Sequence, residues 1–306
     1  MMLAKDIAIL IVSVFVIVKG AVWLVDSSAI IAKRMGISEL VIGLTVIAFG
    51  TSAPEFAVSI LSASKNLGDI SIGNIVGSNI FNLGFILGGT AMICALQTNK
   101  SHVKRDGGFL LLGSVLLLFF LWDLKLSLYE GVFFLLLLVV YLGYLYWKKE
   151  PMESEVRDHS FGWKDPVLLV VGLIMILGGS HFLVESATSM AKQFGVSEWA
   201  IGVTIVAAGT SAPEFATSII AALRGHHGIS VGNLIGSDIF NMFGVLGVVS
   251  VMKTLTVDVA ARSNIIALAV MVLIVVIFMF TGSKVSKKEG SILFSIGLVR
   301  WIMSLT

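Results

Sequence analysis

The sequence predicts an all-α polytopic membrane protein whose ten transmembrane helices form two five-helix repeats of inverted topology. Three observations support this fold class. Of the 306 residues, 57% are hydrophobic and only 13% are charged, whereas soluble domains are about half apolar and a quarter charged. The apolar residues fall into ten stretches, each near the roughly 20 residues that a bilayer-spanning helix needs. One long block of sequence also occurs twice.

The ten stretches divide into two sets of five, separated by a charged polar segment. We therefore expect a first repeat over 1–147, a linker over 148–164 and a second repeat over 165–306. The predicted spans lie near residues 6–25, 39–63, 71–96, 107–123, 129–147, 165–183, 199–222, 231–252, 263–281 and 289–304.

The duplication has a constant offset of 159 residues. ISELVIGLTVIAFGTSAPEFAVSI at Ile37–Ile60 returns as VSEWAIGVTIVAAGTSAPEFATSI at Val196–Ile219, and ISIGNIVGSNIFN at Ile70–Asn82 returns as ISVGNLIGSDIFN at Ile229–Asn241. Five spans is an odd number, so the second copy must enter the membrane in the opposite sense to the first. The two motifs of each copy fall on the consecutive predicted helices 39–63 and 71–96, and 199–222 and 231–252.

The distribution of lysine and arginine predicts the orientation, because short cytoplasmic loops carry an excess of them. With the N-terminus outside, the cytoplasmic segments hold thirteen such residues and the outer segments hold seven. We therefore expect both termini outside, a cytoplasmic linker and, since no organelle signal is visible, a multi-pass protein of the plasma membrane. The basic residues form no tract, so nucleic acid is not expected as a partner; the lipid bilayer is, and no obligate protein partner is evident.

Each copy contains Gly-Thr-Ser-Ala-Pro-Glu within an apolar helix, ending at Glu55 and at Glu214. An acidic side chain at the bilayer centre costs about 3 kcal/mol and faces a bundle interior, a cavity or a partner. The preceding Pro54 and Pro213 lack an N–H, so they release the carbonyl group four residues earlier from the helix and kink it. A dehydrated cation would satisfy such a carbonyl.

Further oxygen-bearing side chains occur at helical spacing. Thr51 and Ser52 precede Glu55 by four and three residues, which predicts that all three share one helix face, and Ser78 precedes Asn82 by four. Carboxylate, amide, hydroxyl and carbonyl oxygens are the ligands that Ca²⁺ and Na⁺ prefer. The equivalent residues of the second copy are Thr210, Ser211, Ser237 and Asn241.

Each feature also has a structural interpretation. Serine and threonine in membrane helices often only pack or bond between helices. Gly73 and Gly77, and their equivalents Gly232 and Gly236, form G-x-x-x-G steps for which close helix packing is the expected role. Two glutamates at equivalent positions, each beside a helix break and a hydroxyl pair, favour a functional site.

At these residues the sequence resembles the sodium/calcium exchanger family of the cation/Ca²⁺ exchanger superfamily, whose two α-repeats carry G-T-S-x-P-E or -D followed by G-S-N-x-x-N or -D. The resemblance covers nearly the whole chain, with a short linker where many eukaryotic relatives hold a regulatory domain. It implies an antiporter, not an enzyme, that exchanges Na⁺ for Ca²⁺ by alternating access and has no organic cofactor. It implies coordination by Glu55, Glu214, Thr51, Ser52, Ser78, Asn82, Thr210, Ser211, Ser237 and Asn241, with the backbone carbonyls of Ala48 and Ala207.

Two positions depart from the family pattern. Some relatives, including those that co-transport K⁺, carry Asp at the position of Asn241, so Asn predicts transport without K⁺. Asp238 stands where the motif usually has Asn, as at Asn79 in the first copy. It lies about 100° around the helix from Ser237, so we expect it to flank the site, with a supporting, proton-linked or packing role before direct coordination.

Charge predicts the exchange cycle. With Glu55 and Glu214 ionised the site carries −2, which one Ca²⁺ or two Na⁺ neutralise, and the third Na⁺ that the resemblance implies makes transport electrogenic. A Ca²⁺/H⁺ or other cation/proton antiporter could use the same carboxylates, although that branch usually lacks G-T-S-x-P. A channel is disfavoured by inverted repeats with helix breaks, and an intramembrane enzyme by the lack of a zinc or nucleophile constellation.

Overall fold

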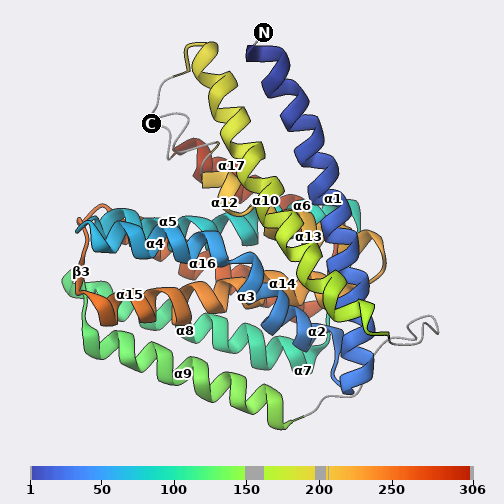
Figure 1. Ribbon diagram of the computed structural model, residues 1–306. Helices are drawn as coiled ribbons and strands as arrows, with labels where there is room; N and C mark the ends of the chain where they lie inside the picture. Colours follow the sequence, from blue (N-terminus) through green and yellow to red (C-terminus); the bar gives the residue numbers. More distant parts are fainter. Residues whose placement is uncertain (1, 149–161, 197–204, 206, 304–306) are drawn as a thin grey trace.

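The computed structural model describes residues 2–148, 162–196, 205 and 207–303, and these are helical except for short connections and four two-residue strands (Figure 1). The first half contains α1 (Met2–Met35), α2 (Glu39–Ile42), η1 (Gly43–Ile47), α3 (Ala48–Thr51), α4 (Ala53–Ser64), α5 (Gly68–Phe81), η2 (Asn82–Leu87), α6 (Gly88–Ile93), β1 (Leu96–Gln97), α7 (Lys100–His102), η3 (Val103–Gly107), α8 (Gly108–Phe120), η4 (Leu121–Asp123), β2 (Lys125–Leu126) and α9 (Leu128–Trp147). The second contains α10 (Lys164–Gln193), α12 (Ala207–Thr210), α13 (Ala212–Leu223), α14 (His227–Ile239), η6 (Phe240–Val245), α15 (Leu246–Met252), β3 (Leu255–Thr256), α16 (Ala261–Thr281), β4 (Lys284–Val285) and α17 (Lys287–Met303).

The helices agree with the predicted all-α membrane fold. Seven helical runs in the described residues are long and apolar enough to cross a membrane, and the bent pair Glu39–Thr51 and Ala53–Ser64 makes an eighth. The remaining two segments, α13 and α17, are shorter, at 12 and 17 residues. Most of the predicted linker, and the first part of the predicted span 199–222, lie outside the described residues.

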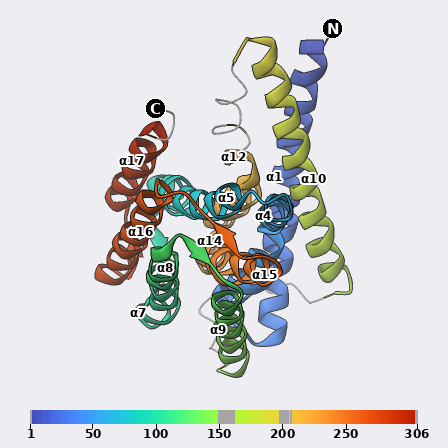
Figure 2. The same cartoon turned by 90° about the vertical axis from the view of Figure 1, so that its left-hand side faces the viewer.

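Two parts of the bundle differ in shape. The long helices α1 and α10 pack side by side along their lengths and run steeply past the other helices (Figures 1 and 2). The other helices form a compact group around α14, in which every residue from Ile229 to Ile239 is buried.

Bilayer helices are apolar on the outside as well as within, and α9 accordingly exposes Val139 and Val140 while burying Phe134.

Two strand pairings and two helix caps repeat the 159-residue offset. The antiparallel strands β1 and β4 pair Leu96 with Val285, and β2 and β3 pair Leu126 with Leu255. In the duplication β3 is equivalent to β1, and β4 is equivalent to β2. The two pairings are therefore symmetry-related links between the halves. The helices that follow β2 and β4 start with the same capping box, Ser127–Glu130 and Ser286–Glu289, in which the glutamate accepts from the serine backbone N–H. The inverted repeat therefore extends beyond the motifs.

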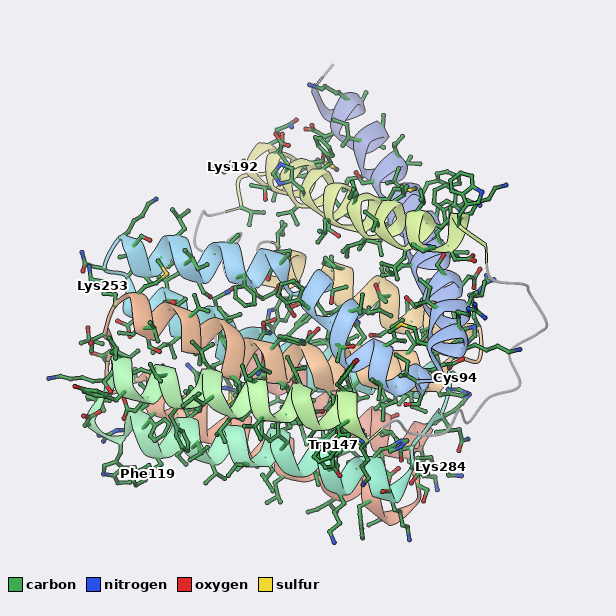
Figure 3. The ribbon with its side chains drawn as sticks, turned by 60° about the horizontal axis from the view of Figure 1, so that its bottom comes forward. Cys94, Phe119, Trp147, Lys192, Lys253 and Lys284 are labelled. Carbon is green, nitrogen blue, oxygen red and sulfur yellow. The ribbon has the colours of Figure 1, made fainter. Side chains whose placement is uncertain are left out.

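The loops fall at two opposite ends of the molecule, as alternating spans require. Figure 3 places Lys192, Lys253 and Phe119 toward one end, and Cys94, Trp147 and Lys284 toward the other. The first group lies in or beside loops that the lysine and arginine distribution predicts to be outside, and the second in or beside loops predicted to be cytoplasmic. The separation of the two groups fits the predicted order of spans.

Candidate cation-binding site

Both motif helices break where the sequence places proline. In the first repeat the axis bends by 47° between α3 and α4, and Ser52 at the break has φ −77° and ψ 5°. Ser211 has nearly the same conformation, φ −88° and ψ 7°, before α13. Pro54 and Pro213 occupy the first turns of α4 and α13, where a missing N–H costs no helical hydrogen bond. The breaks therefore set Glu55 and Glu214 in the first turn of a new helix, where the helix dipole favours a negative charge.

Glu55 is fully buried and receives hydroxyl groups from both repeats. Ser78 donates to its Oε1 across 3.0 Å, and Ser211 donates to the same oxygen across 3.3 Å. The two serine oxygens are themselves 2.9 Å apart. One oxygen of Glu55 is thus held by a serine from its own half and a serine from the other half.

Glu214 has the equivalent arrangement in the second repeat. Ser237, from its own repeat, and Ser52, from the first repeat, donate to its Oε1 at 3.4 and 3.3 Å. The prediction that Ser52 would share a helix face with Glu55 is therefore corrected, because the chain turns at Ser52 and its hydroxyl reaches the opposite glutamate. The exchange of serines between the two glutamates joins the repeats at the centre of the bundle.

The amides lie one turn farther along the second motif helices. Asn82 Nδ2 donates to Asp238 Oδ1 across 2.9 Å, and Asn241 Nδ2 donates to Asn79 Oδ1 across 2.9 Å. Asn82 is the first residue of η2 and Asn241 is the second residue of η6, and both segments are π-helical turns of the kind that often occurs at functional sites. Asp238, predicted only to flank the site, is thus in direct contact with Asn82.

The remaining predicted residues lie around this centre. Thr51 donates to Asn233 Oδ1 at 3.0 Å and lies 3.4 Å from the Ser237 hydroxyl, whereas its equivalent Thr210 is half-buried. The carbonyl of Ala48 accepts the backbone N–H of Ser52 at 3.1 Å, and the Thr51 hydroxyl lies 3.4 Å from it. Ala207 is the first residue of α12.

A further pair of asparagines was not predicted. Asn233 Nδ2 donates to Ser218 Oγ at 2.9 Å and to the backbone carbonyl of Glu214 at 3.4 Å. Its equivalent, Asn74, makes the same two contacts, with Ser59 and with Glu55. These amides fix the second motif helix to the first, and their recurrence at the 159-residue offset was the signal that could have found them.

The site contains an excess of unpaired acceptors. Five buried oxygens have no hydrogen-bond partner among the described residues, although burying an unpaired polar atom costs free energy. Since all five belong to carboxylate or amide carbonyl groups, a cation would satisfy them and an anion would not. Oxygen-only sets of this kind suit Ca²⁺ and Na⁺. The five atoms are Glu55 Oε2, Glu214 Oε2, Asp238 Oδ2, Asn82 Oδ1 and Asn241 Oδ1.

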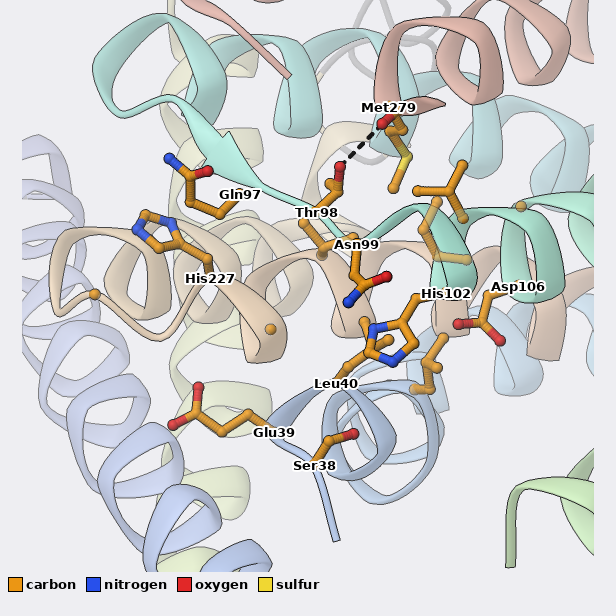
Figure 4. A pocket seen from close by; sticks show the side chains of 17 residues that line it. Ser38, Glu39, Leu40, Gln97, Thr98, Asn99, His102, Asp106, His227 and Met279 are labelled. Atoms are coloured by element: carbon orange, nitrogen blue, oxygen red, sulfur yellow. Dashed lines mark hydrogen bonds between the residues drawn. The ribbon is translucent and has the colours of Figure 1, made fainter. Parts of the chain in front are cut away.

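Two cavities approach the site from opposite loop ends, and they reach different depths. A cavity of about 260 Å³ is lined by Asn74, Ser78 and Ala208 together with Arg300 and Trp301, so it touches the site itself. A second cavity, of about 270 Å³, is drawn in Figure 4. None of the predicted ligands is among its described lining residues, so it stops short of the site. The described lining consists of Ser38, Glu39, Leu40, Leu44, Gln97, Thr98, Asn99, His102, Val103, Asp106, Gly107, Gly225, His227, Gly228, Val231, Ile235 and Met279.

Glycine permits close helix packing beside the site in the second repeat. A Cβ atom built on Gly236 would lie 2.6 Å from the carbonyl oxygen of Leu44, and one on Gly232 would lie 2.5 Å from that of Leu40. The prediction of close helix packing thus holds for this pair. The equivalent Gly73 and Gly77 line the cavity beside Ser78. Residues 199 and 203, which are equivalent to Leu40 and Leu44, lie outside the described residues, so close packing at Gly73 and Gly77 stays a prediction.

A family model and two curated relatives each match nearly the whole chain. The family model "Sodium/calcium exchanger protein" matches residues 5–147 and 164–303. The sodium/calcium exchanger MaX1 of Methanosarcina acetivorans is 33% identical over 339 residues, covering 95% of this chain and 96% of that protein. The putative antiporter CaxA of Alkalimonas amylolytica is 35% identical over 305 residues, covering 93% and 95%.

The fold matches as well. The structure of the sodium-calcium exchanger NCX_Mj soaked with Na⁺ and Ca²⁺ superposes with a TM-score of 0.87 at 31% sequence identity, over 99% of each chain. Members of this family are membrane transporters and not enzymes. With both halves matched by the family model, the chain belongs to the sodium/calcium exchanger family.

Proposed function

We propose that this protein exchanges Na⁺ for Ca²⁺ by alternating access, with Glu55 and Glu214 as the central ligands. The observation that carries the proposal is the set of partnerless carboxylate and amide oxygens between the two repeats. Two facing glutamates supply the charge that one Ca²⁺ neutralises. The names of the relatives MaX1 and NCX_Mj, both sodium/calcium exchangers, support the same pair of ions.

The charge of the site gives a physical reason for obligatory exchange. Without a cation, two buried carboxylates would repel each other and would lack solvation, which makes reorientation of the empty site costly. Either Ca²⁺ or Na⁺ removes this penalty, so the protein changes conformation when loaded. With three Na⁺ exchanged for one Ca²⁺, each cycle moves one net charge.

The exchanger consists of two repeats, 1–147 and 165–306, connected by the linker 148–164. The cavity that touches Ser78 is lined by Asn264 and Arg300, from helix ends predicted to be outside the cell. We infer that the described conformation opens outward, in a cell membrane with both termini outside and the linker cytoplasmic. The presence of Asn instead of Asp at position 241 supports transport that does not need K⁺. No obligate protein partner is proposed.

Ion-gradient experiments in proteoliposomes test this function. The purified protein is reconstituted, loaded with Na⁺, K⁺ or choline, and diluted into ⁴⁵Ca²⁺; a fourth sample has an imposed pH gradient without Na⁺. We expect uptake only from the Na⁺-loaded vesicles. Uptake driven by the pH gradient alone would instead establish Ca²⁺/H⁺ antiport, the second function that the same carboxylates would support.

A further inference from the structure

The site contains a third buried carboxylate that breaks the symmetry of the repeats. Asp238 follows Ser237 in α14 and is fully buried. Its equivalent in the first repeat is Asn79, which is also fully buried. Asn82 contacts the side chain of Asp238 and Asn241 contacts that of Asn79 at the same distance of 2.9 Å, and only the second repeat places a carboxylate in this contact.

The contact between Asp238 and Asn82 leaves two oxygens available. A carboxylate only accepts hydrogen bonds, so the 2.9 Å contact to Asp238 Oδ1 must come from Asn82 Nδ2. That orientation makes Asn82 Oδ1 an acceptor without a partner among the described residues, as Asp238 Oδ2 also is. The pair therefore offers two oxygens and one formal negative charge.

The equivalent contact, between Asn241 and Asn79, lacks this charge. Asn241 donates to the amide oxygen of Asn79 across the same 2.9 Å, and the side-chain amide of Asn79 donates to the backbone carbonyl of Asp238 at 3.2 Å. Asn241 Oδ1 is the third partnerless oxygen of this group. The four residues form one connected polar group beside the glutamate pair.

We propose that Asp238 is the carboxylate of a separate Na⁺ position, completed by Asn82 and next to the position held by Glu55 and Glu214. The proposal rests on the proposed function. A single buried carboxylate balances one monovalent cation, whereas Ca²⁺ needs the two charges of the glutamate pair. Three carboxylates balance three Na⁺, so the Na⁺-loaded site is neutral and the site loaded with Ca²⁺ alone carries −1.

Equilibrium binding of ²²Na⁺ to the purified protein tests this assignment. The Asp238→Asn variant keeps the size of the side chain and removes its charge. We expect the bound Na⁺ to fall from about three to about two per protein, because one balancing carboxylate is lost, with ⁴⁵Ca²⁺ affinity changed less than about threefold, well under 1.4 kcal/mol. Retained Ca²⁺ binding also reports that the variant is folded.

A charge-exchange variant is the matched control. In Asn79→Asp/Asp238→Asn the carboxylate moves to the equivalent position, where Asn241 already points its amide at the side chain of residue 79. This double variant is expected to bind about three Na⁺ again, since three carboxylates are restored. A double variant that binds no more Na⁺ than Asp238→Asn alone would contradict the assignment.

Two further outcomes would overturn it. An unchanged Na⁺ count in Asp238→Asn would show that Asp238 holds no Na⁺, and an equal loss of Na⁺ and Ca²⁺ binding would show that it supports the site as a whole. Failure of the proposed function appears differently: the wild-type protein would then show no Na⁺-driven ⁴⁵Ca²⁺ uptake, whatever residue 238 is.

Discussion

Ser52, in the first repeat, donates its hydroxyl to Glu214, in the second repeat, across 3.3 Å. The equivalent residue of the second repeat, Ser211, donates to Glu55 across the same distance. Each glutamate is therefore oriented by a serine of the opposite repeat as well as by one of its own. A movement of one repeat against the other must change these contacts. Each carboxylate therefore has one oxygen, Oε1, bonded across the repeats and a second, Oε2, that has no partner among the described residues.

The two glutamates are expected to be individually essential. Glu55→Gln or Glu214→Gln removes one of the two charges that balance Ca²⁺, and we predict loss of ⁴⁵Ca²⁺ uptake into Na⁺-loaded proteoliposomes while the protein still folds and inserts. Glu185→Gln is the matched control, because Glu185 is an exposed glutamate of α10. Wild-type flux in either site variant would refute the role of that residue.

The serines that cross between repeats are expected to affect affinity. Ser52→Ala or Ser211→Ala removes a hydroxyl bonded to a carboxylate, a contact of about 1.5–3 kcal/mol, so the Ca²⁺ concentration for half-maximal uptake should rise about tenfold to a hundredfold. Ser64→Ala serves as the control, since the Ser64 hydroxyl donates to the carbonyl of Ile60 in its own helix, on the exposed side of α4. Equal values for Ser52→Ala and Ser64→Ala would argue against the cross-repeat contact.

Gly236 is expected not to tolerate alanine. A methyl group at Gly236 would press on the backbone of Leu44, so Gly236→Ala should destabilise the described conformation by about 1–3 kcal/mol. Gly143→Ala is the control, because Gly143 is an exposed residue of α9 and no described atom lies within 4 Å of a Cβ built there. Thermal unfolding in detergent, with Na⁺ present throughout, measures both. Equal unfolding temperatures for the two variants would contradict the close packing at Gly236.

The residue at position 241 is expected to set the cation dependence. Asn241→Asp replaces the amide that donates to Asn79 by a group that can only accept, and adds a negative charge beside Asp238. We predict a changed dependence of ⁴⁵Ca²⁺ uptake on Na⁺ and K⁺, measured with each ion varied separately. An unchanged profile would count against placing Asn241 in the site.

Transport is expected to respond to membrane potential. Exchange of three Na⁺ out for one Ca²⁺ in moves one positive charge outward, so an inside-positive potential should accelerate Ca²⁺ uptake into Na⁺-loaded vesicles. The driving force is about 2.3 kcal/mol per charge per 100 mV. Uptake rates measured with opposite K⁺ gradients and valinomycin test this, and equal rates would indicate electroneutral exchange.

Much of the fold follows from two properties of the sequence, the apolar stretches and the 159-residue duplication. The duplication also identified the site residues, because Glu55 and Glu214 stand out only when their two motifs are aligned. The strand pairs were not predictable, since two residues such as Leu96 and Gln97 carry no strand pattern of their own and are defined by their pairing with β4.

The cross-repeat contacts were not predictable for a different reason. Sequence spacing relates Ser52 to Glu55 along one helix, but the partner of the Ser52 hydroxyl depends on how two distant helices meet.

Anomalous diffraction from crystals of this protein soaked with Sr²⁺ as a stand-in for Ca²⁺ tests the central claim most directly. We predict one strong peak between Glu55 and Glu214, about 2.5 Å from Oε2 of each, that disappears when Na⁺ replaces Sr²⁺ in the soak. A peak elsewhere in the protein, or one that persists in excess Na⁺, would contradict a shared site for the two ions.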